Sequence, residues 1–228
     1  MMLDPVGDLR RLRERSDWLL TVLTAVLTLV LFVFAPLQAS GISVFHGFAI
    51  GGLLAIIGSM VFISDSPTAL VLMSIALIAN LAVFFLRLYY PLAFHLHILA
   101  GAWLIISVTL GLVVAQAVFK RGRVTYHRII GAILVYLLIA VAFGTLYVFI
   151  GLSFPGAIKG ITFEDDRSLA SAVFYMSFVT LTSTGYGDIV PVHPLARSLC
   201  NIESVIGQLY PATLLARLVT LELRGQSR

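Results

Sequence analysis

Long apolar stretches alternate with short polar breaks along almost the entire chain. Six stretches stand out, at about Trp18–Leu37, Ser43–Ile63, Pro67–Leu86, Ala93–Phe119, Ile129–Leu152 and Leu195–Leu221. About 20 apolar residues suffice for a helix to cross a bilayer, and a helix satisfies every backbone group within its own segment. The pattern therefore predicts an all-α membrane protein with six transmembrane helices.

The stretch between the fifth and sixth segments, Ser153–Pro194, has a different pattern. It contains a polar loop, a short apolar segment at Leu169–Thr182, and then the sequence SFVTLTSTGYGDIVP over residues 177–191. The short segment cannot cross a bilayer, so we expect it to enter the membrane and turn back. Glycine weakens a helix, and irregular backbone at membrane depth is tolerated where protein covers it or where it lines a water-filled cavity. The sequence thus predicts a re-entrant loop whose backbone has a function.

The composition agrees with a membrane protein. The 228 residues are 60% hydrophobic and 11% charged, whereas soluble domains are about 45–50% apolar and about 25% charged. The single cysteine, Cys200, excludes an internal disulfide and a multi-cysteine metal site. Nothing indicates nucleic-acid binding, because Lys and Arg do not form long runs interleaved with aromatics. The first apolar stretch exceeds the about 7–15 residues of a signal-peptide core, which favours a spanning helix over a cleaved signal.

Lys and Arg divide unevenly between the two sides of the predicted membrane domain. With a cytoplasmic N-terminus, ten lie on that side: Arg10, Arg11, Arg13, Arg15, Lys120, Arg121, Arg123, Arg128, Arg224 and Arg228. Four lie on the other side: Arg87, Lys159, Arg167 and Arg197. Because cytoplasmic loops carry the excess of Lys and Arg, we expect both termini in the cytoplasm of a multi-pass cell-membrane protein. The re-entrant loop then opens to the outside.

The residue types in the re-entrant loop suit the coordination of a cation by backbone oxygens. An ion that leaves water needs oxygen ligands at close range, and consecutive carbonyls provide them when all of them turn one way. Such a backbone alternates between ordinary and left-handed conformations, which Gly185 and Gly187 adopt without steric cost. Ser183 and Thr184 are small enough to lie beside them, and Tyr186 can act as an outward spacer. The preceding short helix directs the negative end of its dipole toward the interior, which favours a cation there.

The sequence TSTGYGD resembles the signature of the tetrameric potassium channels, whose TVGYG loop is a known selectivity filter. The match covers Thr182, Gly185, Tyr186, Gly187 and Asp188. The chain departs from the family pattern at Ser183, where threonine is usual, and at Thr184, where valine or isoleucine is usual. Serine keeps the hydroxyl that would line the innermost ion site but lacks the methyl that packs it. The resemblance covers Ile129–Leu221.

The resemblance implies roles for individual residues. K⁺, the permeant ion and the sole expected ligand, would be coordinated in a filter formed by Ser183, Thr184, Gly185, Tyr186 and Gly187. Its ligands would be the carbonyls of the first four and the Ser183 hydroxyl. Thr182, Asp188 and Tyr175, in the aromatic pore helix SAVFYMSFVTLT, would support the filter. Gly207 would be a gating hinge in the inner helix, with Pro211 as a second bend. One filter strand per chain cannot surround an ion, so count and family together imply a homotetramer in the lipid bilayer.

The fourth predicted helix lacks the charges of a voltage sensor. A sensor carries arginines at every third position, whereas AFHLHILAGAWLIISVTLGLVVAQAVF contains neither Lys nor Arg. We therefore expect a channel that is not voltage-gated. Arg87 is expected to anchor at the headgroup level rather than to act as a sensor charge. His95 and His97 are compatible with an interfacial structural role, with pH sensing or, more remotely, with metal or haem ligation.

Glu203 is an ionisable residue inside the last predicted helix, where a charge is costly and usually functional or paired. It could face the conduction path and attract cations. Alternatively, it could lie behind the pore helix, hydrogen-bond Ser177 or Thr180 and hold the filter in place; its position favours this second placement. Asp188 is expected to brace the filter and attract cations, the acidic trio 164–166 to do so more weakly, and Arg217 to extend toward the cytoplasmic interface.

These expectations divide the chain into five parts. They are a cytoplasmic segment (1–16), a four-helix transmembrane domain without gating charges (17–119), a cytoplasmic linker (120–128), a pore domain (129–223) and a cytoplasmic tail (224–228). The leading interpretation is a passive potassium-selective channel, and the alternative is a weakly selective monovalent cation channel. A transporter subunit with four pore repeats, and an intramembrane enzyme or haem carrier, fit less well. The chain is thus not expected to be an enzyme or to bind a cofactor, and its gating could involve an unidentified regulatory partner.

Overall fold

The computed structural model describes residues 18–41, 67–89, 95–119, 126–164, 166 and 168–226. These ranges are mostly helical. The first helix, Trp18–Ala39, contains the π-helical turn η1 (Val30–Phe34) and α2 (Ala35–Ala39). The other helices are α4 (Pro67–Tyr89), α5 (His95–Phe119), α6 (Tyr126–Ser153), α7 (Leu169–Leu181) and α8 (Pro194–Gln226), and the strands are β1 (Ile158–Lys159) and β2 (Val190–Pro191). The predicted second span, Ser43–Ile63, lies outside the described residues.

Three helices in the described ranges are long and apolar enough to cross a membrane. They are Trp18–Ala39, α5 and α6. The apolar parts of α4 and α7 are shorter, and α8 carries polar residues along its 33 residues. The molecule is therefore an all-α membrane protein, while six spans remain a prediction.

The first helix contains a short π-helical turn just before Pro36. Pro36 has no N–H to donate to the carbonyl of Phe32, four residues earlier, and its ring crowds that carbonyl. The chain responds with the π-helical turn η1, in which the Ala35 N–H bonds the Val30 carbonyl across five residues. This turn places Phe32 against Phe178 of α7, with ring centroids 4.8 Å apart.

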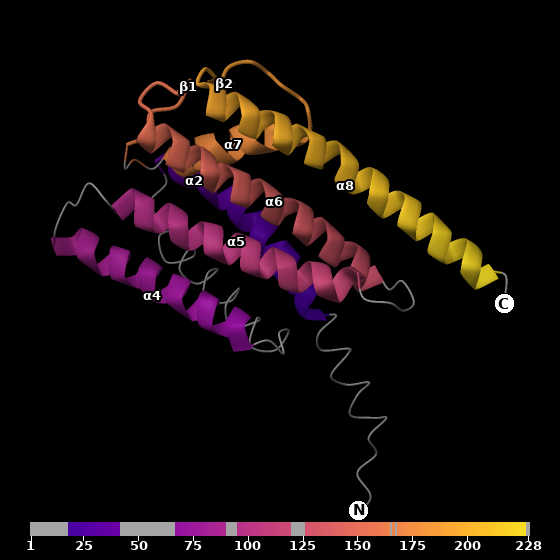
Figure 1. Ribbon diagram of the computed structural model, residues 1–228. Coiled ribbons are helices and arrows are strands. Elements are labelled where there is room, and N and C mark those ends of the chain that lie inside the picture. Colours follow the sequence, from indigo (N-terminus) through magenta and orange to yellow (C-terminus); the bar gives the residue numbers. More distant parts are fainter. Residues whose placement is uncertain are drawn as a thin grey trace, which may run out of the picture.

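The helices form one packed bundle (Figure 1). α4 packs along α5, α5 packs along α6, and α7 lies between α6 and α8. Gly131 lets α6 approach its neighbours closely, because a Cβ there would lie 2.7 Å from Val118 and 3.3 Å from Leu20. The first helix and α5 thus pack directly on α6, across the predicted boundary between the four-helix domain and the pore domain.

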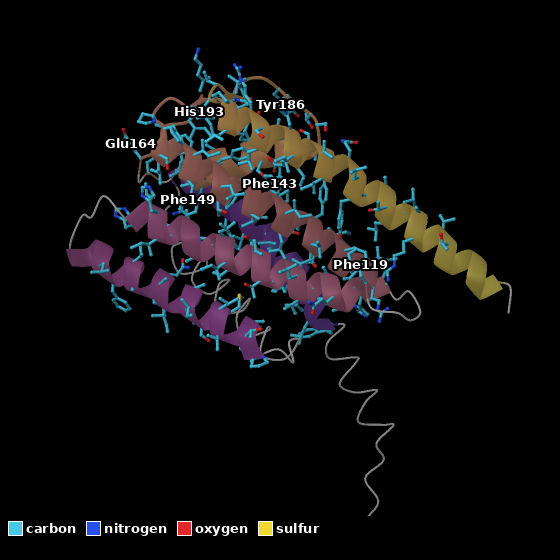
Figure 2. All side chains as sticks on the ribbon, in the orientation of Figure 1. Phe119, Phe143, Phe149, Glu164, Tyr186 and His193 are labelled. Carbon is cyan, nitrogen blue, oxygen red and sulfur yellow. The ribbon has the colours of Figure 1, made fainter. Side chains whose placement is uncertain are left out.

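The two strands lie together at one end of the bundle, beside the start of α8 (Figure 1). β1 pairs with β2 in antiparallel register, with Ile158 opposite Pro191 and Lys159 opposite Val190. Glu164, Tyr186 and His193 lie at this end, whereas Phe119 lies at the opposite end (Figure 2). The pairing therefore connects the loop after α6 to the segment that follows the TSTGYGD sequence.

Candidate ion-conduction site

The TSTGYGD segment (residues 182–188) follows directly from the C-terminus of α7. Ser183, Gly185 and Gly187 have φ values of 56°, 58° and 83°, whereas Thr184 and Tyr186, between them, have ordinary φ values. The backbone thus visits the left-handed region at every second residue. A Cβ on Gly185 or Gly187 would meet none of the described atoms within 4 Å, so conformation rather than space favours glycine there.

The first left-handed residue also closes the helix. The N–H of Thr184 donates to the Val179 carbonyl and the N–H of Ser183 donates to the Thr180 carbonyl, both at 2.9 Å. These two bonds are the Schellman arrangement, which usually has glycine at the left-handed position. Ser183 occupies it here, and its side chain is held in turn, because Gln208 Nε2 donates to Ser183 Oγ at 3.0 Å.

Threonine hydroxyl groups at the start of the TSTGYGD segment form hydrogen bonds within the segment and to α7. The Oγ1 atoms of Thr182 and Thr184 lie 2.8 Å apart, and Thr182 Oγ1 donates to the Phe178 carbonyl at 2.7 Å. Thr182 therefore lies at the junction between α7 and the segment, and its role as a supporting residue stays a prediction.

The other end of the segment is held by α7 from the side. The Tyr175 side chain lies near the Asp188 carboxylate. The Tyr175 ring stacks on that of Tyr186, with centroids 6.2 Å apart and planes at 2°. The Tyr186 side chain is nevertheless 70% exposed in the single chain, so one of its faces is free to contact another molecule.

Glu203 lies in a buried hydrogen-bond cluster between three helices. Its Oε1 lies 2.5 Å from Ser177 Oγ of α7, and its Oε2 accepts a hydrogen bond of 2.5 Å from the Tyr147 hydroxyl of α6. The Tyr147 hydroxyl is also 3.2 Å from Cys200 Sγ. Both Glu203 and Ser177 are fully buried. This is the second of the two placements considered from the sequence, and the Thr180 carbonyl is contacted instead by the Ser204 hydroxyl at 3.2 Å.

Tyr147 is the member of this cluster that sequence reasoning missed. It is 0% exposed, and it is one of three tyrosines in the mostly apolar helix α6. A buried tyrosine usually finds a partner for its hydroxyl, and that signal was present in the sequence.

Gly207 lies where α8 crosses the end of α7. A Cβ at this position would be 1.8 Å from the Leu181 carbonyl oxygen, so a side chain does not fit. α8 continues as one helix through both Gly207 and Pro211. The hinge role of these two residues stays a prediction, while close packing gives Gly207 an independent reason to be glycine.

Of the remaining candidate residues, the structure describes His95, His97, Glu164, Asp166 and Arg217. His95 and His97 are in the first turn of α5, and the His97 ring lies 6.3 Å from that of Phe149. Hydrogen bonds from the Ser168 hydroxyl and backbone N–H lower the pKa of Asp166, which keeps this exposed loop residue negative. Arg217 donates to the Phe119 carbonyl at 2.6 Å and lies over the Phe119 ring. Asp165, Arg167 and the side chain of Arg87 lie outside the described residues.

Residues 133–223 match a protein family described as ion channel. This part of the chain is similar to an ion channel domain. It contains most of α6, all of α7, the TSTGYGD segment and α8 as far as Leu223. No curated protein and no solved structure matches the chain. The match supports an ion channel, and the TSTGYGD segment, α7 and the Glu203 cluster lie within the matched residues.

Proposed function

We propose that this chain forms a homotetrameric, potassium-selective channel in the cell membrane and conducts K⁺ passively. The proposal has α7 as a re-entrant pore helix, residues 183–187 as the selectivity filter and α8 as the inner helix. The single observation that carries it is the left-handed conformation at Ser183, Gly185 and Gly187. Alternation of this kind turns successive carbonyls toward one side, where they can replace water around an ion.

The surroundings of the segment support the same function. The C-terminus of α7 directs the negative end of a helix dipole toward the start of the filter, which stabilises a cation. Asp188 adds a carboxylate at the other end of the filter, and Asp166 adds a further negative charge to the loop before α7. Cations are thus favoured along the proposed path.

One chain provides one quarter of the proposed pore. A Cβ on Gly185 or Gly187 would meet no atom of the described residues within 4 Å, and Tyr186 is mostly exposed. Three further copies around a fourfold axis would cover these surfaces and complete the ring of oxygens. Because α5 contains no Lys or Arg, we also propose that voltage does not gate this channel.

The function is tested with purified protein in liposomes that hold a K⁺ gradient. We expect K⁺ flux that exceeds Na⁺ flux and that Ba²⁺ blocks, together with a tetramer in a sizing measurement. Gly185→Ala should abolish the flux because φ is +58° there. Gly41→Ala is the matched control, since Gly41 also has a positive φ (+91°) and a Cβ there meets none of the described atoms within 4 Å, but it lies outside the filter. Absence of cation flux through the wild-type tetramer would reject the proposal.

A weakly selective cation channel is the second candidate. The observation that favours it is the hydrogen bond from Gln208 to the Ser183 hydroxyl, because that hydroxyl is the side-chain ligand expected at the innermost ion site. The reversal potential with K⁺ on one side and Na⁺ on the other separates the two candidates. A potential near zero favours weak selectivity, and a large one favours a potassium channel.

A further inference from the structure

The chain just beyond the TSTGYGD segment is bound to the loop that follows α6. β1 and β2 pair in register, and the pairing extends past the strands, because the N–H groups of Val192 and His193 both donate to the Ala157 carbonyl, at 2.8 and 3.0 Å. We call residues 157–160 and 188–193 together the β clamp. It connects two parts of the chain that α7 separates (Figure 1).

The β clamp is anchored in the core rather than exposed as a free loop. Ala157 and Ile158 are 3% and 2% exposed, and Ile158 belongs to the same buried cluster as Tyr147 and Met176. The ring of His193 also stacks on Phe154, with centroids 4.4 Å apart and planes at 18°. The loop side of the clamp is therefore fixed relative to α6 and α7.

Gly160 is the point at which the β clamp contacts the end of the filter segment. Its φ is +90°, and a Cβ there would lie 2.5 Å from the Asp188 carbonyl oxygen and 3.2 Å from Ile189 Cα. The side chain of Asp188 lies near Tyr175 of α7. The backbone of Asp188 is thus in close contact with the loop that follows α6, and its side chain lies near α7.

We propose that the β clamp sets the conformation of the outer end of the filter and that Gly160 is a positioning residue for ion conduction. The inference rests on the proposed channel function. Gly185 and Gly187 have no side chains through which the filter could be held, so contacts at its two ends contribute to its shape. The inner end is fixed by the Schellman bonds to Val179 and Thr180, and the β clamp fixes the outer end.

The test compares Gly160→Ala with Gly156→Ala in the full-length protein in K⁺-loaded liposomes. Both glycines have positive φ, +90° and +77°, but a Cβ on Gly156 meets no described atom within 4 Å. The control therefore carries the backbone strain without the close approach. We expect Gly160→Ala to lower K⁺ flux about tenfold or more relative to Gly156→Ala, because added atoms at a close backbone contact displace one of the two segments.

A second readout separates positioning from a general loss of structure. Ions that bind the conducting filter stabilise that conformation by mass action. Raising K⁺ on both sides, with the flux followed as exchange of a K⁺ tracer, should therefore restore much of the flux in Gly160→Ala and change it little in Gly156→Ala. A merely structural defect would lower the amount of tetramer and would not respond to K⁺ in this way.

Each outcome decides the question. If the wild type conducts no cations, the proposed function fails and the inference fails with it. If the wild type conducts K⁺ and the two glycine variants behave alike, the inference alone is overturned. If Gly160→Ala does not assemble, the double variant Lys159→Cys/Val190→Cys decides, because these two positions face each other across the strands at a distance that suits a disulfide. If oxidation makes the flux of this double variant less dependent on K⁺, the proposal is supported. If oxidation leaves the flux unchanged, the proposal is overturned.

Discussion

Ser177 and Glu203 lie side by side behind the proposed filter, with Oγ of the serine 2.5 Å from Oε1 of the glutamate. Ser177 Oγ is also 2.7 Å from the Ala140 carbonyl, which can only accept. The serine has one hydrogen to donate. The arrangement satisfies every group when Ser177 donates to Ala140, Glu203 is protonated and donates to Ser177, and Tyr147 donates to Glu203 Oε2. A neutral glutamate then connects α6, α7 and α8.

Substitutions at Glu203 should therefore separate its hydrogen bonds from its charge. Glu203→Gln keeps one donor and one acceptor, and we expect a stability and K⁺ flux close to wild type. Glu203→Ala leaves the buried Tyr147 hydroxyl without its carboxyl partner, at a cost of about 1–3 kcal/mol. The thermal midpoint of the tetramer in detergent and the liposome flux measure both effects. An equal loss of stability and flux in the two variants would show that the negative charge of Glu203, rather than its hydrogen bonds, is required.

Tyr147→Phe tests the third member of the cluster. It removes the donor to Glu203 Oε2 without leaving a large cavity, and we expect it to destabilise the protein by about 1–3 kcal/mol because a buried acceptor loses its partner. Tyr136→Phe is the matched control on the same helix, because the hydrogen bond from the Tyr136 hydroxyl to the Leu181 carbonyl is long, at 3.4 Å, and therefore weak. A control that is as destabilised as Tyr147→Phe would contradict the assignment.

At Gly207, packing and hinge roles predict different results. A Cβ 1.8 Å from the Leu181 oxygen must push α8 away from α7, so Gly207→Ala should lower the yield and thermal midpoint of the tetramer as well as its flux. Gly111→Ala is the control, since its Cβ would make an ordinary contact of 3.9 Å with Leu138. A Gly207→Ala tetramer of normal stability that gates abnormally would favour the hinge role alone.

Sequence patterns predicted the long elements closely where the boundaries are marked by polar or turn-forming residues. The short helix was expected at Leu169–Thr182 and forms at Leu169–Leu181, and the fifth was expected at Ile129–Leu152 and forms at Tyr126–Ser153. Its extra N-terminal turn includes His127, whose Nδ1 lies 2.9 Å from Thr21 Oγ1 of the first helix. Such a partner across the bundle cannot be read from a local pattern.

The sequence predicted candidate filter residues and several supporting residues, but not the contacts that Ser183, Gly160 and Gly207 make. The alternation of glycines indicates a left-handed backbone at Gly185 and Gly187, whereas Ser183 adopts it because the end of α7 closes there. β1 and β2 have two residues each, too few for any periodicity, and they form because the chain returns to the same place after α7. Gly160 and Gly207 lie where distant segments approach each other closely, so the sequence alone could not show that packing requires glycine at these positions.

The conductance should depend little on membrane voltage. One elementary charge that crosses the field contributes about 2.3 kcal/mol per 100 mV, and α5 contains no Lys or Arg to contribute such a charge. We expect the conductance of a planar bilayer that contains the protein to change by less than about tenfold over about 200 mV. A steep conductance–voltage relation would contradict this and would require gating charges elsewhere in the chain.

Arg217 connects the end of α8 to the end of α5, and this contact should contribute to stability through both the charge and the ring. Its Nη2 donates to the Phe119 carbonyl at 2.6 Å, at a helix C-terminus where the dipole favours a cation, and its guanidinium lies 4.7 Å from the centroid of the Phe119 ring.

Phe119→Leu removes the ring and keeps the carbonyl, whereas Arg217→Ala removes both interactions. A double-mutant cycle on the thermal stability of the tetramer should give a coupling of about 0.5–1 kcal/mol for the ring contact. A larger loss for Arg217→Ala than for Phe119→Leu is expected, because the carbonyl loses its donor as well. Additive effects of the two substitutions would show that the guanidinium and the ring do not stabilise one another.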